Sequence, residues 1–191
     1  QWALTSEIVL PSTTRPWKTY PGVFAKSSLD PATAALLNVL PTPPAQTRIL
    51  DFASGPGTIA AELIAREPSI RLALLDHDAL ALAAARENVP GASFLLSDSW
   101  HRPPGRHRWD LIVSNPPIHK GRSQDFQVLE DLITGSPLRL TQGGELWLVC
   151  LSHLPVRKSI EQAFDDRGEI AWTDGRFTVW RCPVDESNSP D

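Results

Sequence analysis

The sequence predicts an α/β fold: a mostly parallel sheet with helices on both faces and an antiparallel C-terminal hairpin. Short apolar runs such as RILDF (48–52) alternate with segments of helical periodicity, an order typical of parallel sheets. These runs are continuously apolar, as are strands that are buried on both faces. The last two runs, EIAWT (169–173) and RFTVWR (176–181), are joined by Asp174 and Gly175, a pair that favours a tight hairpin turn.

The chain before this alternation is expected to hold a hairpin and one helix. Residues 1–29 contain short apolar and aromatic stretches separated by prolines, a pattern that predicts a strand or hairpin appendage. Asp30 suits the N-cap of the next helix, Pro31 its first position, and Pro41 its end. We therefore expect a helix that begins at Pro31 and ends before Pro41.

The alternation itself predicts seven strands and four further helices. The expected strands are 48–52, 70–75, 93–96, 109–114, 145–151, 169–173 and 176–181. The expected helices are 58–66, 78–88, 124–135 and 156–164. A chain of 191 residues that is 41% hydrophobic suits a single globular core. We therefore expect one domain over residues 30–182.

The charge distribution bears on the kind of partner. A net charge of −4 argues against a strongly basic nucleic-acid-binding protein. Three of these negative charges belong to the tail PVDESNSPD (183–191), which has no basic residue and is expected to be disordered. The rest of the chain is nearly neutral and can carry a local basic rim. RNA therefore stays among the expected partners.

Cysteine usage, apolar runs and the absence of methionine set further bounds. Cys150 and Cys182 lie far apart without metal-ligand spacing, so we expect reduced thiols rather than a zinc site or a disulfide. No run approaches the roughly 20 apolar residues that span a bilayer, and the opening lacks the basic segment of a signal peptide. We expect a soluble, cytoplasmic protein with no membrane partner. Because the chain contains no methionine, we also expect it to be one domain of a longer protein.

Candidate ligand-binding residues follow the strands, because open α/β sheets bind ligands at the carboxyl ends of their strands. After the first strand, DFASGPGT places Gly55 and Gly57 where the backbone can approach a ligand and a helix N-terminus follows. The pair formed by the P-loop lysine and the hydroxyl residue that directly follows it is missing from this segment. The alternative is a plain connection from strand to helix.

Acidic residues follow the second and third strands. Asp76 comes roughly 20 residues after the glycine loop, a separation at which a carboxylate can hold the hydroxyls of a ribose. Asp76 or Asp78 can instead cap the next helix, and we expect Asp78 to be the cap. After the third strand, Asp98 can accept from an adenine amino group and Trp100 can cover a ring face. The alternative there is a polar loop with its tryptophan in the core.

The fourth strand ends in VSNPPIHKG (113–121), where two prolines directly follow Asn115. Pro116 and Pro117 fix two φ angles and remove two backbone donors. The segment therefore leaves the strand rigid and rich in carbonyl acceptors. Such a pair of acceptors suits a ligand that presents N–H groups.

These strand ends, in this order and closed by a hairpin, resemble the class I S-adenosylmethionine-dependent methyltransferases that modify amino groups. Four segments also resemble the catalytic domain of the ribosomal RNA guanine-N2 methyltransferases, the small-subunit methyltransferase C family and its large-subunit relative. They are YPGVFAKSSLD (20–30), SNPPIHKG (114–121), GGELWLVCLSHLP (143–155) and TDGRFTVWR (173–181). The resemblance implies a Rossmann-like methyltransferase fold with a seven-stranded sheet. It also implies a preceding methyltransferase-like domain in the full-length chain.

The resemblance further implies S-adenosyl-L-methionine as the cofactor and no metal. The implied cofactor-binding residues are Asp51, Ala53, Gly55, Gly57, Asp76, Asp98 and Asn115. The implied catalytic residues are Asn115, Pro116, Pro117 and Ile118. The Asn115 oxygen and the Pro116 carbonyl would accept from a guanine amino group as it becomes tetrahedral and positive. The implied substrate-binding residues are Lys26, His119, Lys120 and Arg122.

Two positions depart from the family pattern. Ala53 stands where the cofactor loop of the family has a glycine, and a methyl group is tolerated there if φ is negative. Ile118 stands where methyltransferases with this motif carry an aromatic residue. A guanine must leave its stack to reach such a site, and Ile118 can pack on the flipped base but offers no π face.

We expect methyl transfer to the N2 amino group of a guanine in ribosomal RNA, most readily the 16S RNA of the small subunit. The expected partner is ribosomal RNA or the small ribosomal subunit, with the protein as a monomer or weak dimer. One alternative is a glutamine-N5 methyltransferase of release factors, because those enzymes also use Asn-Pro-Pro. The other is a methyltransferase-like domain that binds RNA without catalysis.

Overall fold

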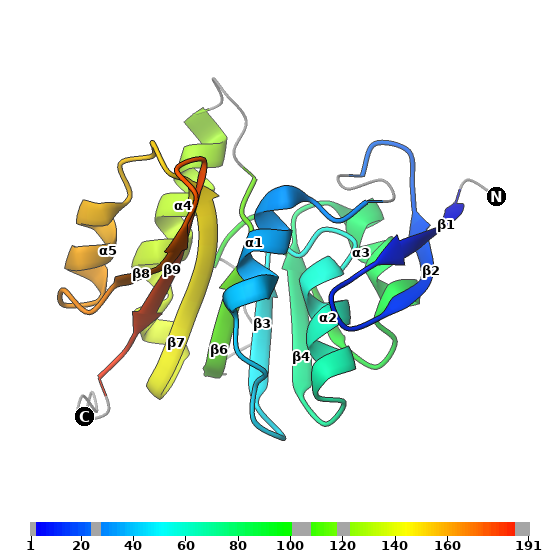
Figure 1. Cartoon of the computed structure of the whole chain (residues 1–191), viewed down its shortest axis with the longest axis horizontal. Coiled ribbons are helices and arrows are strands. Elements are labelled where there is room, and N and C mark those ends of the chain that lie inside the picture. Colours follow the sequence, from blue (N-terminus) through cyan, green and yellow to red (C-terminus); the bar gives the residue numbers. More distant parts are fainter. Residues whose placement is uncertain (1–2, 24–27, 101–107, 118–122, 186–191) are drawn as a thin grey trace.

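The computed structural model describes residues 3–23, 28–100, 108–117 and 123–185, and it contains the expected seven-stranded sheet. The strand order is β5-β4-β3-β6-β7-β9-β8, in which β9 runs antiparallel to both neighbours and the other pairs are parallel (Figure 1). The strands are β3 (Arg48–Phe52), β4 (Arg71–Asp76), β5 (Ser93–Leu96), β6 (Trp109–Ser114), β7 (Leu140–Leu151), β8 (Glu169–Thr173) and β9 (Phe177–Pro183). The predicted fold class is confirmed.

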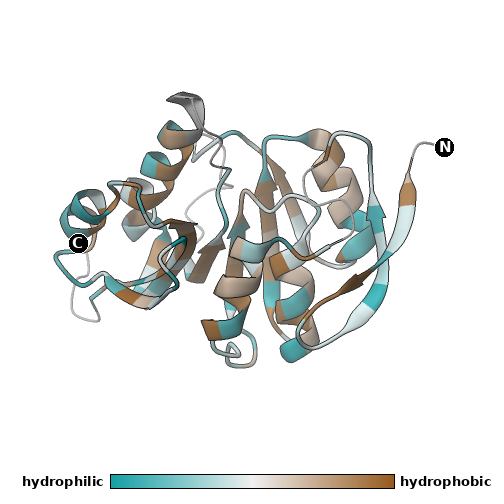
Figure 2. Cartoon of the chain, turned by 45° about the horizontal axis from the view of Figure 1, so that its top comes forward, coloured by the Kyte–Doolittle hydropathy of each residue, from teal (hydrophilic) through white to brown (hydrophobic). Residues whose placement is uncertain are grey.

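Helices cover both faces of this sheet. On one face lie α1 (Pro31–Val39), α2 (Thr58–Arg66) and α3 (Ala79–Asn88). On the other lie α4 (Ser123–Gly135), a short 3-10 helix η1 (Pro137–Arg139) and α5 (Arg157–Ala163). Alternate strand residues point to opposite faces, so Val113 packs in the first core and Ile112 in the second. Figure 2 shows the resulting apolar colour along the strands.

The N-terminal hairpin is part of the core rather than an appendage. Strands β1 (Leu4–Val9) and β2 (Thr14–Thr19) form an antiparallel two-stranded sheet beside α3 (Figure 1). Ile8 and Trp17 are fully buried in the core that α1, α2 and α3 share. Asn88 of α3 pairs with the backbone of Lys18, accepting from its N–H at 2.8 Å and donating to its carbonyl at 2.9 Å.

A buried carboxylate joins the hairpin to α1 and α2. Glu62 is fully buried and accepts from the backbone N–H of Ser12 at 3.0 Å and from its hydroxyl at 2.6 Å. Arg66 donates to the same carboxylate at 2.8 Å and to the carbonyls of Leu37 and Leu40 at the end of α1. The N-terminal hairpin is therefore linked to α1, the helix that begins beside the carboxyl ends of the parallel strands.

Two strands have boundaries that differ from the predicted ones by more than one residue. Strand β7 begins at Leu140, ahead of the predicted residue 145, because Leu140 already pairs with Trp109 of β6 before a register shift. The residues between Leu140 and Glu145 are polar residues and glycines, which do not show the apolar run used for the prediction. Strand β9 runs through Pro183, and Asp185 accepts from Arg167 at 2.6 Å. The predicted disordered tail over 183–191 is therefore wrong for its first three residues. The remaining residues, 186–191, lie outside the described chain.

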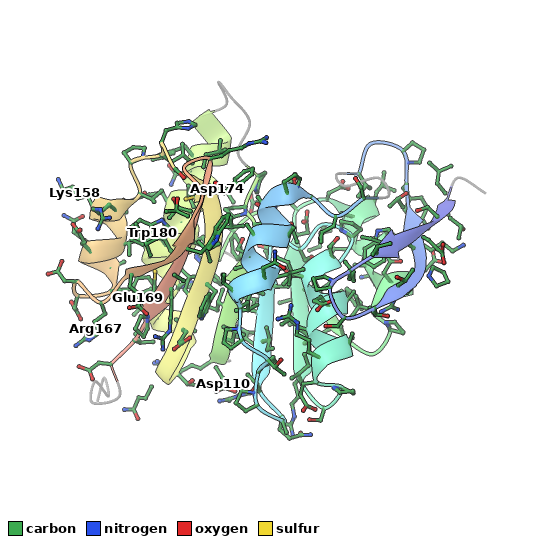
Figure 3. The ribbon with its side chains drawn as sticks, viewed as in Figure 1. Asp110, Lys158, Arg167, Glu169, Asp174 and Trp180 are labelled. Atoms are coloured by element: carbon green, nitrogen blue, oxygen red, sulfur yellow. The ribbon has the colours of Figure 1, made fainter. Side chains whose placement is uncertain are left out.

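The two ends of the sheet carry different chemistry. At the end where parallel strands begin, Arg48 of β3 donates to Asp110 of β6 at 2.7 Å and 3.0 Å. Figure 3 shows Asp110 at the lower end of the sheet and Asp174, in the turn before β9, at the upper end. The carboxyl ends of the parallel strands lie at this upper end.

Over the described residues, no helix is both long and apolar enough to cross a membrane.

Candidate active site

A cavity of about 490 Å³ lies at the carboxyl ends of β3, β4, β6 and β7, beside the start of α1. A pocket of this size and position is typical of ligand sites in α/β sheets. Six of the predicted site residues line it, and they come from three different strand ends. They are Ala53, Gly55, Asp76, Asn115, Pro116 and Pro117.

The glycine loop borders the cavity through one of its two glycines. Gly55 has φ +55°, and nothing lies within 4 Å of the position that a Cβ would take there, so its backbone faces open space. Gly57, with φ +89°, does not line the cavity. A Cβ at Gly57 would lie 2.9 Å from Cγ2 of Val89 and 3.1 Å from Cδ2 of Leu74. This glycine lets the start of α2 pack closely against α3 and β4.

Ala53 adopts the conformation that glycine favours. Its φ is +56°, in the left-handed region. The sequence-based condition for a tolerated methyl group, a negative φ, is therefore not met. For an L-residue this region costs about 1–2 kcal/mol, so Ala53 stores strain in the wall of the cavity.

Asp76 anchors the glycine loop while lining the cavity. Its Oδ2 accepts from the N–H of Gly55 at 2.7 Å, and its Oδ1 accepts from the N–H of Asp78 at 2.8 Å. The carboxylate has further lone pairs on each oxygen with which to accept from a ligand. Asp78 is the N-cap of α3, accepting from Leu80 N–H at 2.8 Å, as predicted. His77 between them is exposed and also lines the cavity.

Asp51 lies beneath the cavity rather than on its surface. Its side chain is fully buried, and its Oδ2 accepts from the N–H of Ala60 in α2 at 3.2 Å. Its Oδ1 has no hydrogen-bond partner among the described residues. Burial raises the pKa of this carboxyl to about 8; the Ala60 N–H opposes the shift and the charge of Asp76 adds to it. Asp51 thus ties β3 to α2 below the loop.

Among the described residues, the end of the third strand, β5, contributes none to the cavity wall. Trp100, predicted to cover a ring face, is instead a core residue: it is buried, and its ring centroid lies 4.7 Å from that of Phe52. Its Nε1 donates to the carbonyl of Asp131 in α4 at 2.6 Å. The alternative interpretation of this tryptophan is therefore the correct one. Asp98 is exposed at the end of β5 and does not line the cavity.

The amide of Asn115 is held from α1. Its Nδ2 donates to Oδ2 of Asp30 and to Oγ1 of Thr33, each at 2.9 Å. The preceding Ser114 is buried and donates to the carbonyl of Phe52 at 2.7 Å, which fixes the strand end.

Five predicted residues lie outside the described part of the chain. They are Lys26, Ile118, His119, Lys120 and Arg122.

Several residues that line the cavity were not predicted. Asp30 was assigned only as a helix cap, yet it lines the cavity beside Asn115. Leu151 and Cys150 come from the end of β7, and Phe177 comes from the start of β9. The tight turn at Asp174 was the one available signal, because it returns the next residues to the sheet, where Phe177 pairs with Leu151 of β7. Burial raises the pKa of the Cys150 thiol to about 12, so it stays protonated and is no nucleophile at neutral pH.

Over the described residues, no group of three or more histidine, cysteine, aspartate or glutamate side chains is arranged to hold a metal ion. The cavity wall instead offers carbonyl, amide and carboxylate acceptors beside apolar side chains. Such a wall can hold hydroxyl and amino groups and cover a flat ring.

The family model described as methyltransferase small domain matches residues 15–181. Relatives named ribosomal RNA small subunit methyltransferase C, from Citrobacter koseri and Salmonella newport, are each 36% identical over 172 residues. These alignments cover 86% of this chain and 48% of each relative, so the chain spans about half the length of the relatives it matches.

Solved structures share the fold. The 16S rRNA N2 methyltransferase of T. thermophilus, in complex with AdoMet and guanosine, superposes with a TM-score of 0.86 at 20% identity. That match covers 96% of this chain and 51% of the other. TrmN from Thermus thermophilus superposes with a TM-score of 0.61 at 24% identity, covering 81% of this chain and 48% of the other. At these identities the superpositions establish the shared architecture.

Proposed function

The chain belongs to the methyltransferase small domain family, and from this premise we propose that it methylates the N2 amino group of a guanine in 16S ribosomal RNA. The observation that carries the proposal is the position of Asn115 and Pro116. They stand in the wall of one cavity with Gly55 and Asp76. A cofactor held by the glycine loop and an amino group held by Asn115 would therefore share one space. The names of the 36% identical relatives support ribosomal RNA as the substrate.

The residues present fit S-adenosyl-L-methionine as the cofactor. The Gly55 backbone borders open space, so a ligand can approach the loop closely. The Asp76 carboxylate, only 6% exposed, lines the same cavity and retains lone pairs for the two hydroxyls of a ribose. Bound there, the cofactor would supply a methyl group on a positively charged sulfur.

The task left to the protein is to hold and polarise a poor nucleophile. The lone pair of a guanine amino group is delocalised into the ring, and methylation makes that nitrogen tetrahedral and positive. The Asn115 side-chain oxygen and the Pro116 carbonyl can accept its two N–H groups, which favours that geometry and stabilises the charge as it develops. A base with a shifted pKa is unnecessary, because the proton can leave for water after the new N–C bond has formed.

The structure supplies a candidate for the aromatic contact that Ile118 cannot make. Phe177 lines the cavity together with Leu151 and Pro117, and it is 9% exposed. The Arg176 guanidinium lies 4.8 Å from the Phe177 ring centroid, which adds positive charge near the rim. We assign to Phe177 the role of covering the flipped guanine. Base–aromatic stacking of this kind is worth about 1–3 kcal/mol.

The decisive experiment supplies the chain with S-adenosyl-L-methionine and 16S ribosomal RNA that lacks N2 methylation, both free and in the small subunit. Digested nucleosides are then identified by mass spectrometry. We expect N2-methylguanosine to form in at least one of the two substrates, and to form far more slowly with the Asn115→Ala variant. Methylation of a release factor instead of RNA would replace the proposal by the glutamine-N5 alternative. Binding of RNA with no methylated product would favour a non-catalytic domain.

A further inference from the structure

The helix cap of α1 and the amide of Asn115 share one carboxylate oxygen. Oδ2 of Asp30 accepts from the backbone N–H of Thr33 at 2.9 Å, the usual contact of an N-cap residue. The same oxygen accepts from Nδ2 of Asn115 at 2.9 Å. Nδ2 also donates to Oγ1 of Thr33 at 2.9 Å. Both hydrogens of the Asn115 amide nitrogen are therefore directed toward the first turn of α1.

An asparagine amide can face a ligand with either end, and the two ends do opposite things. The oxygen accepts from an amino group, whereas the NH₂ end presents hydrogens to hydrogens. A carboxylate oxygen can only accept, so turning the amide over would place oxygen against oxygen at Asp30 and lose that hydrogen bond, whereas the Thr33 hydroxyl can donate to the amide oxygen as well as accept from the amide nitrogen. The contact to Asp30 thus leaves the oxygen as the end that faces away from the helix.

We propose that Asp30 is a positioning residue that holds the Asn115 amide with its oxygen toward the acceptor amino group. The proposal rests on the function proposed above and extends it to a residue outside the Asn-Pro-Pro motif. Both residues line the cavity, and 85 positions separate them in the chain. The contact therefore depends on the docking of α1 against the end of β6.

The charge of Asp30 strengthens this role. A hydrogen bond to a carboxylate is stronger than one to a neutral acceptor, and donating it polarises the amide so that its oxygen becomes a better acceptor. A negative side chain one amide away also favours the positive charge that develops on the substrate nitrogen. The rate of methyl transfer should therefore respond to Asp30 more strongly than the binding of either substrate does.

A pure capping role for Asp30 is separable from this one by substitution. Serine is an equally good N-cap, but its hydroxyl ends one atom short of the carboxylate oxygen that Asn115 uses. In Asp30→Asn, a side-chain oxygen remains to cap Thr33 and to accept from Asn115, but the charge is lost. Thr33→Val removes only the second, neutral acceptor and keeps the shape of the side chain.

Single-turnover rates on ribosomal RNA, KM for RNA, calorimetric cofactor affinity and Tm are measured for the wild type and the three variants. For Asp30→Ser we expect a rate about 10- to 100-fold lower, with Tm and cofactor affinity nearly unchanged, from the worth of a charged hydrogen bond. Asp30→Asn should recover part of that rate, and Thr33→Val should lose only a few-fold. A wild-type rate in Asp30→Ser, or a loss matched by a fall in Tm, would overturn the positioning role.

A second readout does not depend on catalysis. Solvent exchange of the Asn115 side-chain amide hydrogens, followed by NMR, should be slow in the wild type and in Asp30→Asn and fast in Asp30→Ser. If the wild type methylates no RNA but this pattern holds, the proposed function fails and the orientation of Asn115 by Asp30 stands. Equal exchange in all three proteins overturns the inference whatever the activity.

Discussion

The backbone N–H of Gly55 donates to the carboxylate of Asp76 at 2.7 Å, so the end of β4 holds the loop that follows β3. One carboxylate therefore shapes the cofactor loop and also faces the space where a cofactor would bind. The two roles make different demands on the side chain. Loop shaping needs one acceptor oxygen, whereas holding two hydroxyls needs both.

Substitution of Asp76 should affect cofactor binding before RNA binding. We expect Asp76→Ala to weaken the calorimetric affinity for S-adenosyl-L-methionine at least tenfold, because it removes hydrogen bonds from a charged acceptor. Asp76→Asn, which retains one acceptor oxygen for Gly55, should keep Tm closer to that of the wild type. If Asp76→Ala lowers Tm but leaves the cofactor affinity unchanged, the role of Asp76 is only structural.

Ala53 predicts a stabilising substitution in the wall of the site. Its φ of +56° strains an L-residue, so Ala53→Gly should raise the free energy of unfolding by about 0.5–1 kcal/mol after the entropy cost of glycine is subtracted. Ala65, exposed in α2, is the matched control, because glycine there should lower the same quantity by a similar amount. Denaturant titration of the two variants compares the signs. If both substitutions change the free energy of unfolding in the same direction, Ala53 is not strained.

Asp51 predicts a pH dependence of stability. Folding raises its pKa to about 8, so the folded protein keeps a proton that the unfolded chain releases near its ordinary carboxyl value of about 4. The stability from this group is fully present at acid pH and is lost as pH rises through about 8. Asp51→Asn cannot titrate. Thermal unfolding from pH 5 to pH 9 should therefore show the variant gaining stability relative to the wild type as pH rises, and a constant difference would contradict the buried neutral acid.

Phe177 predicts an effect confined to the RNA side. Phe177→Ala should raise KM for RNA about tenfold through lost stacking, while cofactor affinity stays within a factor of two. Phe177→Leu keeps most of the apolar packing and removes the π face, so it separates stacking from core stability. If Phe177→Leu matches the wild type in both KM and rate, stacking on the base is not the role of this ring.

The sequence foretold the parts of the site that local rules determine. Asp30 as N-cap and Asp78 as N-cap follow from side-chain preference at helix starts, and both caps are present. The Asn-Pro-Pro segment was placed correctly at the end of β6, because a buried apolar run leads into it. These features depend on neighbouring residues in the chain.

What the sequence could not foretell depends on docking between distant elements. Trp100 is a core residue because α4 docks beside it. The Asp131 carbonyl of α4 accepts a hydrogen bond from the Trp100 indole N–H. The cavity wall at Phe177 depends on how the C-terminal hairpin returns along β7, and the contact of Asn115 with Asp30 depends on where α1 docks. Periodicity and capping patterns describe residues that are close in the chain, so they do not predict contacts between distant elements.

The central claim is that the Asn115 oxygen accepts from the amino group of a guanine, and one measurement tests it most directly. Single-turnover formation of N2-methylguanosine in unmethylated 16S ribosomal RNA is compared between the wild type and Asn115→Ala, with cofactor affinity measured on the same samples. The account predicts a rate at least about 100-fold lower, as for the loss of a group that stabilises developing charge, with cofactor affinity nearly unchanged. A variant that methylates as fast as the wild type would contradict it.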